Sequence, residues 1–443
     1  MKIVITSSYK IDGETGVAVI AAELAKYLSK GNDVLFVCLG DSFETKSKNN
    51  LKILTLPSMF VKYGDVPSIS PNVYSKLKRE LKNFSPDIIH AQNVLLVDLL
   101  TITWGMNNKV PILITFHQVP TDALYHVLPK LAGKKIGHAI TYPYSKIHAK
   151  RLLENVNGVV ALNFAVESSI RKISSTIKIF RVNNGLNLLK LLSLKPKKQV
   201  RIKKFVFLGS YFPRKNQEFL INAFRYMPKN YKLDLYGNKS TGGEYLEKLL
   251  RLVDRYQLTG VDVKDFVHRN DIHKIYQSAD YLISASIKEA QSLVIIESLA
   301  SATPVIGLSN ETTDELINSS NGLVLDKNTD PKDFAEKTVK FIRGSDYKKL
   351  STQARVDASP FEINNVIGQL NNIYLRVTKE GPKTRAKSNK SLYYFLPKSV
   401  HKNFKASRRS KYVNFAAGIT LAITSVVSIF TIAKGIRNKI SDR

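Results

Sequence analysis

The chain alternates short apolar runs of β type with stretches of helical periodicity, and this alternation constrains the fold most. In the first half, a helical stretch at residues 16–31 follows the first apolar run and ends at Gly31. Strands that alternate with helices predict a parallel sheet covered by helices on both faces. The apolar runs of the first half are residues 2–8, 33–40, 86–92, 110–117 and 158–163.

A second series of apolar runs follows in the other half of the chain, at residues 205–210, 231–237, 261–267, 281–286 and 303–309. A length of 443 residues also exceeds one ordinary domain. We therefore expect two α/β domains that face a cleft, with ligands outside the carboxyl ends of the strands. The expected boundaries are 1–187 and 188–358, followed by a helix at 359–378. The basic stretch 188–204 is interpreted as the interdomain linker and the edge of the second domain.

The composition is strongly basic, with 67 Lys and Arg against 36 Asp and Glu, a formal net charge of +31. Such a charge calls for an anionic partner, either nucleic acid or an acidic membrane surface. Neither a nucleic-acid motif nor zinc-ligand spacing is recognisable, so we expect a membrane surface and no nucleic acid. A lone cysteine, Cys38, excludes an intrachain disulfide and indicates a reducing compartment. The N-terminus reads as a first buried strand rather than a signal peptide.

The last part of the chain has a different character. Residues 379–411 form a basic linker, and residues 412–433 are 22 residues without a charge. About 20 apolar residues suffice to span a bilayer. Six basic residues precede this segment and four follow it, which predicts a cell-membrane protein with its large domains on the cytoplasmic side. The alternative is a buried or interfacial helix.

Two carboxylates bracket the segment EAQSLVIIE, Glu289 in a predicted loop and Glu297 in the helix that follows. Ser292 is a candidate N-cap for that helix. The free N–H groups of a helix N-terminus suit a phosphate, and carboxylates accept hydrogen bonds from sugar hydroxyls. The pattern therefore fits a nucleotide-sugar site. The alternative is two solvated glutamates at a helix start.

The residues around this pair resemble the retaining glycosyltransferases of family four, which have the GT-B fold. The resemblance rests on a Glu-x7-Glu pattern, a small-residue stretch and Pro-Val-Ile at 304–306, with Ala302 where family members often carry Gly. It extends over roughly residues 1–377 and implies two Rossmann-like domains, with a helix near 360–377 that packs back on the first. By resemblance, Glu289 contacts the donor sugar and Glu297 binds the ribose hydroxyls. We add three residues to the donor-binding set: Ala290, Gln291 and Ser292.

The stretch after the predicted strand 205–210 carries a second part of the resemblance. The family expects Gly-Arg and then a Lys five residues after the Arg, which together bind the diphosphate of the donor. Gly209 and Lys215 match, whereas Ser210 replaces the Arg and Arg214 offers a substitute charge. A solvated basic loop is the alternative for Arg214 and Lys215. No Asp-x-Asp occurs in the chain, so a metal-bridged diphosphate site is not indicated. We expect neither a metal nor another cofactor, with the nucleotide-sugar as donor substrate.

Three features of the first half match the family more loosely. Gly16 lies in a glycine-containing turn that resembles the family's first loop and would let a phosphate or acceptor approach the backbone. His117 ends a predicted strand where the family has a histidine near the reacting sugar, and His90 occupies a similar strand end. Asn184–Gly185 matches an architectural turn, with Asn187 in place of the family's acid.

These features predict a retaining glycosyltransferase that moves a hexose from a nucleotide-diphosphate sugar, a UDP-sugar, to a membrane lipid or lipid-linked acceptor. Front-face transfer is the mechanism that the resemblance implies, with no protein nucleophile. One alternative is a transferase of cell-surface polysaccharide synthesis with a soluble or polyprenyl-linked acceptor. Another is a basic membrane- or nucleic-acid-binding protein with a degenerate sugar site, suggested by Ser210 and Asn187.

Overall fold

A computed structural model describes residues 1–11, 15–61, 64–67, 71–117, 149–194 and 203–383. The predicted hydrophobic segment 412–433 and most of the basic linker 379–411 lie outside these residues. Within the described part of the chain, no helix is both long enough and apolar enough to cross a bilayer.

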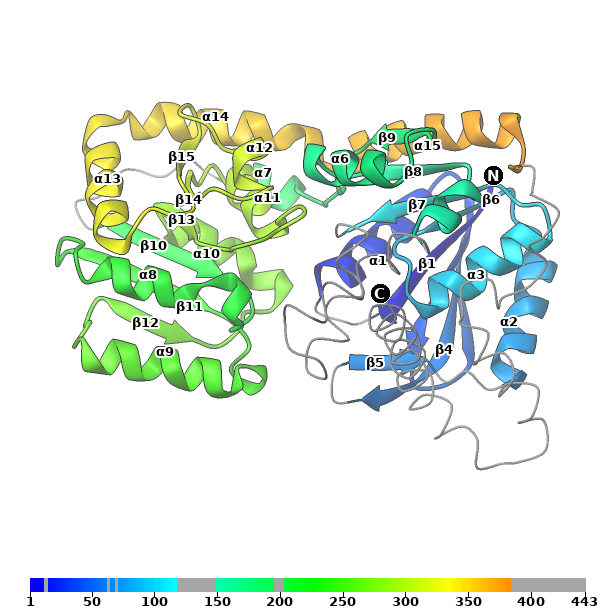
Figure 1. The fold of residues 1–443 in the computed structure, drawn as a ribbon, viewed down its shortest axis with the longest axis horizontal. Coiled ribbons are helices and arrows are strands. Elements are labelled where there is room, and N and C mark those ends of the chain that lie inside the picture. The colour runs from blue at the N-terminus through cyan, green and yellow to red at the C-terminus, as the bar shows by residue number, and fades with distance from the viewer. Residues whose placement is uncertain (12–14, 62–63, 68–70, 118–148, 195–202, 384–443) are drawn as a thin grey trace, which may run out of the picture. The chain divides into compact units, whose positions relative to one another are not determined.

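The chain forms two compact units, each built on its own sheet (Figure 1). The first unit contains residues 1–162, 166–182 and the chain from Ile367 onward. The second contains Asn163–Ala165 and Asn183–Val366. The two α/β units predicted from the alternating sequence pattern are therefore present, although the first is assembled from separate stretches of chain.

The sheet of the first unit has the strand order β3-β4-β2-β1-β6-β7-β8-β9, with β5 paired to β4. In this order the strands from β4 to β9 run parallel to one another, as predicted. The aliphatic side chains of β1, β2, β6, β7 and β8 are buried. The sheet is not purely parallel, however, because β3 and β5 both pair antiparallel with β4. The strands are β1 Lys2–Lys10, β2 Asp33–Gly40, β3 Glu44–Lys48, β4 Leu51–Val61, β5 Gly64–Pro67, β6 Ile88–Ala91, β7 Ile112–Phe116, β8 Gly158–Ala161 and β9 Ile179–Arg181.

Helices connect these strands and cover the sheet. The first begins after Thr15, whose hydroxyl accepts a hydrogen bond from the N–H of Ala18 at 3.3 Å. Helix α15 is the last helix of the described chain, and its part from Ile367 onward belongs to the first unit. There it buries Leu370, Tyr374 and Val377. The helices are α1 Gly16–Leu28, α2 Pro71–Phe84, α3 Leu96–Asn107, α6 Phe164–Ile173 and α15 Ile363–Glu380.

The sheet of the second unit is parallel throughout, with the order β12-β11-β10-β13-β14-β15. Its strands are β10 Lys203–Leu208, β11 Tyr231–Tyr236, β12 Val261–Lys264, β13 Tyr281–Ser284, β14 Val305–Leu308 and β15 Gly322–Leu325. Its helices are α7 Leu189–Leu192, α8 Gln217–Phe224, α9 Gly243–Arg255, α10 Ile272–Ser278, α11 Leu293–Ala300, α12 Thr313–Leu316, α13 Pro331–Gly344 and α14 Tyr347–Ala358.

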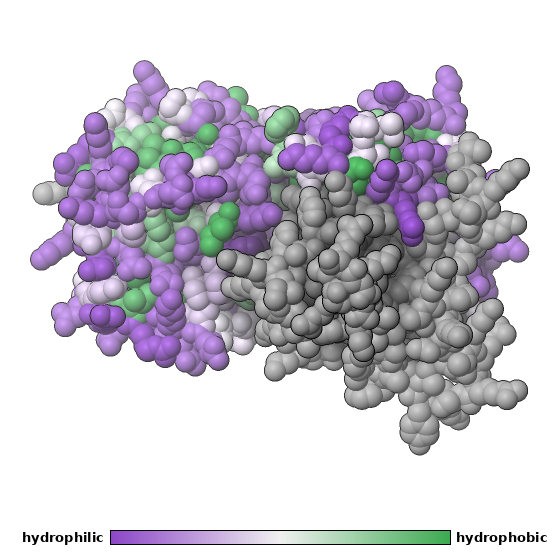
Figure 2. All heavy atoms as spheres, viewed as in Figure 1, coloured by the Kyte–Doolittle hydropathy of each residue, from purple (hydrophilic) through white to green (hydrophobic). Residues whose placement is uncertain are grey.

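One core of this unit packs Phe205 and Phe207 of β10 against apolar side chains of α8, α9 and α13. Phe205 stacks on Tyr281 and meets Phe224 edge-on, with ring centroids 5.6 and 5.4 Å apart. On the face of this unit that Figure 2 shows, hydrophilic residues predominate and hydrophobic ones form small separate patches. The apolar side chains of the strands are thus sequestered between sheet and helices.

Helix α11 ends in a Schellman motif built on an alanine. The N–H of Ala302 donates to the carbonyl of Leu299 and that of Thr303 to Ser298, both at 2.9 Å. Ala302 accordingly adopts the left-handed conformation, with φ of 56°. This conformation favours glycine, which explains why the family's usual residue here is Gly.

Candidate functional site

The turn between β10 and α8 places two cations at the carboxyl end of the second sheet. Gly209 follows β10, and the short 3-10 helix Pro213–Lys215 carries Arg214 and Lys215. Asn216 then reverses the chain in the left-handed conformation before α8 begins. Both cations therefore lie where ligands of parallel α/β sheets bind.

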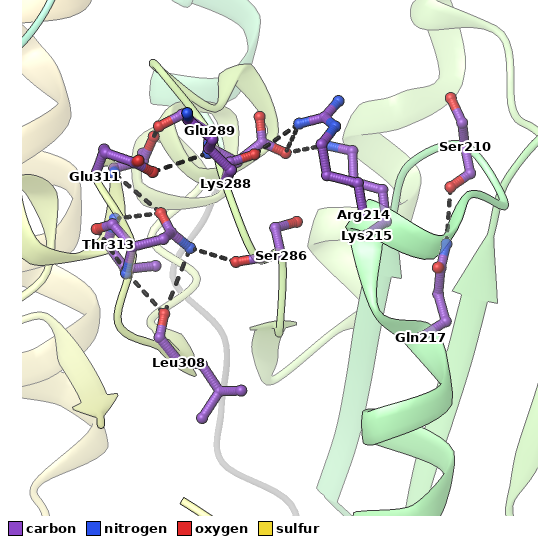
Figure 3. Close-up of polar contacts among 12 residues, drawn as sticks. Ser210, Arg214, Lys215, Gln217, Ser286, Lys288, Glu289, Leu308, Glu311 and Thr313 are labelled. Carbon is purple, nitrogen blue, oxygen red and sulfur yellow. Dashed lines mark hydrogen bonds and ion pairs between the residues drawn. The ribbon is translucent and has the colours of Figure 1, made fainter. Parts of the chain in front are cut away.

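The predicted carboxylate Glu289 lies against these two cations. Its Oε1 atom accepts a hydrogen bond from the Lys215 ammonium and lies 3.6 Å from the Arg214 guanidinium (Figure 3). The side chains of Glu289 and Lys215 are largely buried, whereas that of Arg214 is 44% exposed. Three residues predicted separately as donor-binding or catalytic thus form one ionic cluster.

A second set of hydrogen bonds fixes the loop that carries Glu289. The Arg214 guanidinium donates to the carbonyl of Lys288 at 2.6 Å, and the N–H of Glu289 donates to Glu311 at 3.2 Å. The side-chain amide of Asn310 donates to the carbonyl of Ser286 at 2.9 Å. The loop is thus tied to the segment after β14. Glu311 and Asn310 were not predicted, because nothing in their spacing indicates this contact.

Glu297 lies on α11 and is 3% exposed. Its Oε1 atom lies 2.9 Å from the Arg269 guanidinium, and its Oε2 atom accepts a hydrogen bond from the Tyr276 hydroxyl at 3.1 Å. Burial, and next the neighbouring charge of Glu297, raises the pKa of Tyr276 well above its usual value, so this hydroxyl stays a donor. Arg269 and Tyr276 were missed from the sequence, since no family motif covers them.

The residues between the two carboxylates have mainly positioning contacts. Ser292 occupies the N-cap position of α11 as predicted, but its hydroxyl makes no capping hydrogen bond. The Gln291 side chain accepts from the N–H of Asn184 at 2.7 Å and donates to Asn183 at 3.1 Å. The carbonyl of Ala290 accepts from the side chain of Asn163. Gln291 and Ala290 therefore anchor the loop to neighbouring chain segments in the second unit.

A small open pocket lies between this loop and the sheet. Its lining includes Lys215, Ser292 and residues at the ends of β10 and β13, among them Ser284 and Ser286. The free N–H groups at the start of α11 and the Lys215 ammonium both favour an anion. The pocket therefore has the chemistry of a phosphate site. Ser210, which replaces the family's Arg, contributes no charge to it. The Ser210 carbonyl instead accepts from Gln217 at 2.8 Å.

Two predicted residues belong to the first unit. Gly16 is the exposed first residue of α1, directly after Thr15. His117 follows β7, is 9% exposed, and its Nε2 atom lies 3.2 Å from Oε1 of Gln92. Burial lowers the pKa of His117 to about 4, so the ring is neutral near pH 7.

His90, the second histidine, has a structural environment. Its two ring nitrogens lie 2.7 Å from the hydroxyls of Tyr374 and Thr115. Burial, with a smaller contribution from His117, lowers the pKa of His90 to about 3.

Among the described residues, no group of three or more His, Cys, Asp or Glu side chains could hold a metal ion. The expectation that no metal or other cofactor takes part remains a prediction.

Family models match most of the chain. The model described as Glycosyltransferase Family 4 matches residues 15–188, and the model described as Glycosyl transferases group 1 matches residues 193–357.

Two curated relatives are alpha-monoglucosyldiacylglycerol synthases. The one from Streptococcus pneumoniae is 25% identical over 325 residues, which is 68% of this chain and 70% of the relative. The one from Acholeplasma laidlawii is 21% identical over 348 residues, 74% of this chain and 85% of the relative.

Among solved structures, a sucrose-phosphate synthase from Thermosynechococcus elongatus has a TM-score of 0.70 at 18% identity and covers 86% of this chain and 99% of its own. The Anabaena protein HepE, solved in complex with UDP-glucose, has a TM-score of 0.65 at 15% identity and covers 85% and 100%. At these identities the structures are informative about the fold, which is a two-unit α/β architecture of the GT-B type.

Proposed function

Because the chain belongs to the family-four glycosyltransferases, we propose that it transfers a hexose from a UDP-sugar to a membrane lipid or lipid-linked acceptor, with retention at the anomeric carbon. The observation that carries the proposal is the cluster of Lys215, Arg214 and Glu289 at the carboxyl end of the second sheet. Cations suited to a diphosphate meet a carboxylate suited to sugar hydroxyls in this cluster.

The choice of donor and acceptor draws on the relatives. Both curated relatives are named as synthases of a glucosylated diacylglycerol, and the HepE structure contains UDP-glucose. A lipid acceptor also accounts for the net charge of +31, because anionic membrane surfaces attract basic proteins. We accordingly place the enzyme at the cell membrane with its two units on the cytoplasmic side, and the segment 412–433 remains the predicted anchor.

The proposed roles follow from the contacts in the second unit. Lys215 and Arg214 would stabilise the charge that develops on the departing diphosphate. Glu297, oriented by Arg269 and Tyr276, would accept hydrogen bonds from the ribose hydroxyls. Glu289 would orient the hexose. In front-face transfer an oxygen of the departing diphosphate takes the proton of the acceptor hydroxyl, so no side chain needs to form a covalent bond to the sugar.

The contact of Glu289 with Lys215 and Arg214 adds one requirement to this scheme. Glu289 neutralises the cations that are proposed to hold the diphosphate. Donor binding therefore exchanges partners: the diphosphate takes the cations, and Glu289 turns to the hydroxyls of the hexose. The Coulomb attraction between Lys215 and the diphosphate largely replaces the attraction between Lys215 and Glu289. Contacts to the sugar must therefore contribute to the affinity for the donor.

The test is transfer by the full-length protein in detergent or vesicles. UDP- and GDP-hexoses are supplied with diacylglycerol, glucosyldiacylglycerol or a membrane lipid extract, and products are identified by mass spectrometry and anomeric NMR. We expect an α-linked glycolipid from an α-linked UDP-hexose. Glu289→Gln keeps the shape of the side chain and should remove most transfer. Lys337→Met, an exposed change on α13, is the control. Transfer that survives in Glu289→Gln would contradict the assigned site, and an inverted product would contradict retention.

A further inference from the structure

The carboxyl end of the first sheet contains two buried polar groups that the proposed roles do not use. The hydroxyl of Ser7 and the side-chain Nε2 of Gln92 have no hydrogen-bond partner among the residues that the structure describes. Both side chains are 1% exposed. An unpaired buried donor costs free energy, so such groups are rare and call for an explanation.

The two groups are neighbours. β1 and β6 are adjacent parallel strands in which Ile5 pairs with His90 and Thr6 with Ala91. The N–H of Gln92 continues this ladder by donating to the carbonyl of Thr6 at 3.2 Å. Ser7, inside β1, and Gln92, directly after β6, therefore stand side by side on the face that also carries Ile5 and His90.

On the opposite face of β1, the buried hydroxyl groups all have hydrogen-bond partners. The hydroxyls of Thr6 and Ser8 donate to the buried carboxylate of Asp98 on α3, at 2.5 and 2.6 Å. Ser7 lies between these residues in sequence and points to the other face, where no described residue receives it. The strand thus pairs its hydroxyls on one face and leaves one unpaired on the other.

The third member of the group is His117. Its Nε2 atom lies 3.2 Å from Gln92, which fixes the orientation of the amide and leaves the amide Nε2 as a donor toward another oxygen. Two donors from adjacent strands, next to a neutral imidazole, match the hydrogen-bonding pattern of a hydroxyl group.

We propose that Ser7 and Gln92 form a subsite for a substrate hydroxyl, beside His117, where β1 continues past the carboxyl end of β6. This hydroxyl belongs either to the transferred hexose or to the polyol headgroup of the acceptor. The inference rests on the proposed function in this respect. Ser7 and Gln92 would each donate a hydrogen bond to that oxygen, and Gln92 would in addition hold the ring of His117.

The experiment compares Ser7→Ala and Gln92→Met with Thr101→Ala in the full-length protein. Thr101 is a matched control, because it is fully buried in the same unit and its hydroxyl is paired, donating to the carbonyl of Val97 at 3.0 Å. Three quantities are measured for each variant: the thermal midpoint, kcat and KM of transfer, and the rate of UDP-hexose hydrolysis without acceptor.

Ser7→Ala should lower kcat/KM of transfer by about 3- to 10-fold while the thermal midpoint stays or rises, since the hydroxyl it removes has no partner in the protein. Thr101→Ala should show the reverse, a lower midpoint with normal kinetics. A parallel loss of UDP-hexose hydrolysis assigns the hydroxyl to the donor, whereas normal hydrolysis with a raised acceptor KM assigns it to the acceptor.

Normal kinetics in Ser7→Ala and Gln92→Met overturn the subsite, and a lowered midpoint with normal kinetics identifies a buried water as the missing partner. These outcomes are separable from a failure of the proposed function. Absence of transfer by the unaltered protein contradicts that function, whereas normal transfer by the unaltered protein and by Ser7→Ala contradicts the subsite alone.

Discussion

The hydroxyl of Tyr374 lies 2.7 Å from Nδ1 of His90, although the two residues are 284 positions apart in the chain. The rings meet edge to face, with centroids 5.6 Å apart, and both side chains are almost fully buried. The hydroxyl of Thr115 forms a hydrogen bond with the other ring nitrogen of His90. A neutral histidine with both nitrogens paired is a structural group, and here it attaches α15 to the middle of the first sheet.

Tyr374→Phe should destabilise the first unit by about 1–3 kcal/mol, because it leaves a buried nitrogen of His90 without a partner. Differential scanning calorimetry or thermal scanning by circular dichroism measures the change. Tyr226→Phe is the control, since Tyr226 is 45% exposed in the second unit. A midpoint of Tyr374→Phe equal to that of this control would show that the contact does not stabilise the unit.

Lys215→Met should weaken UDP binding by about tenfold or more, the cost of one charge-assisted hydrogen bond. Arg214→Gln should have a smaller effect, because this guanidinium is more exposed and already donates to the carbonyl of Lys288. Isothermal titration calorimetry gives both dissociation constants, with Lys337→Met as the reference. Equal affinity in all three variants would place the diphosphate elsewhere.

Ser210→Arg should strengthen UDP binding, since it restores the charge that family members carry at this position. Ser210 is exposed, so a longer side chain can be accommodated without repacking the core. Arg and phosphate form bidentate contacts, and the gain should decline with added salt. The titration is repeated at two salt concentrations. An unchanged dissociation constant at low salt would mean that Arg214 already supplies this charge fully.

The buried carboxyl of Asp98 should make the free energy of unfolding depend on pH. Burial raises the pKa of this carboxyl to about 6, against the opposing hydrogen bonds from Ser8, Thr6 and two backbone N–H groups. A raised folded-state pKa means that the folded protein binds this proton more tightly than the unfolded chain. The resulting stabilisation is complete below pH 4 and is lost as pH rises through 6.

The unfolding free energy of the unaltered protein should therefore rise relative to Asp98→Asn, by up to about 3 kcal/mol, as pH falls from 8 toward 4. Thermal unfolding at several pH values measures the difference. Thr101→Ala, a change without a titrating group in the same helix, should give an offset that does not vary with pH. A constant offset for Asp98→Asn as well would show that the carboxyl does not titrate in this range.

Ala302→Gly should stabilise the second unit by about 0.5–1 kcal/mol. A residue with a Cβ atom is strained in the left-handed conformation, and glycine relieves this strain at some cost in chain entropy. Ala354→Gly is the matched control and should destabilise the same unit. Ala354 is buried inside α14, and glycine is unfavourable in a helix interior. If both changes lower the midpoint, the packing of the Ala302 methyl group outweighs the strain.

The sequence predicted the sheets well and the contacts poorly. Buried parallel strands such as β1 and β13 were recognisable because each contains an uninterrupted apolar run, as strands covered on both faces usually do. Strand β3 was not, since its residues ETKSK are all exposed and lie on the sheet only by pairing with β4.

The candidate site shows the same division. Local motifs identified Lys215 and Glu289, but their contact spans 74 positions and depends on the order of β10 and β13 in the sheet. Arg269, Tyr276 and Gln92 have no local signal, because each acts through a residue on another element. Ser292 shows the converse: its position at the helix start was predicted, but its side-chain capping bond does not form.

The discontinuity of the first unit has a consequence during protein synthesis. The residues of α15 that complete this unit are translated only after the whole second unit has been made. Until then the nascent chain exposes the apolar surface that Leu370, Tyr374 and Val377 later cover. All strands of both sheets, β1 to β9 and then β10 to β15, are therefore synthesised before the first unit receives its last helix. A fragment ending at residue 187 would lack its final helix, so expression of the first unit alone requires α15 to be joined to it through a designed linker.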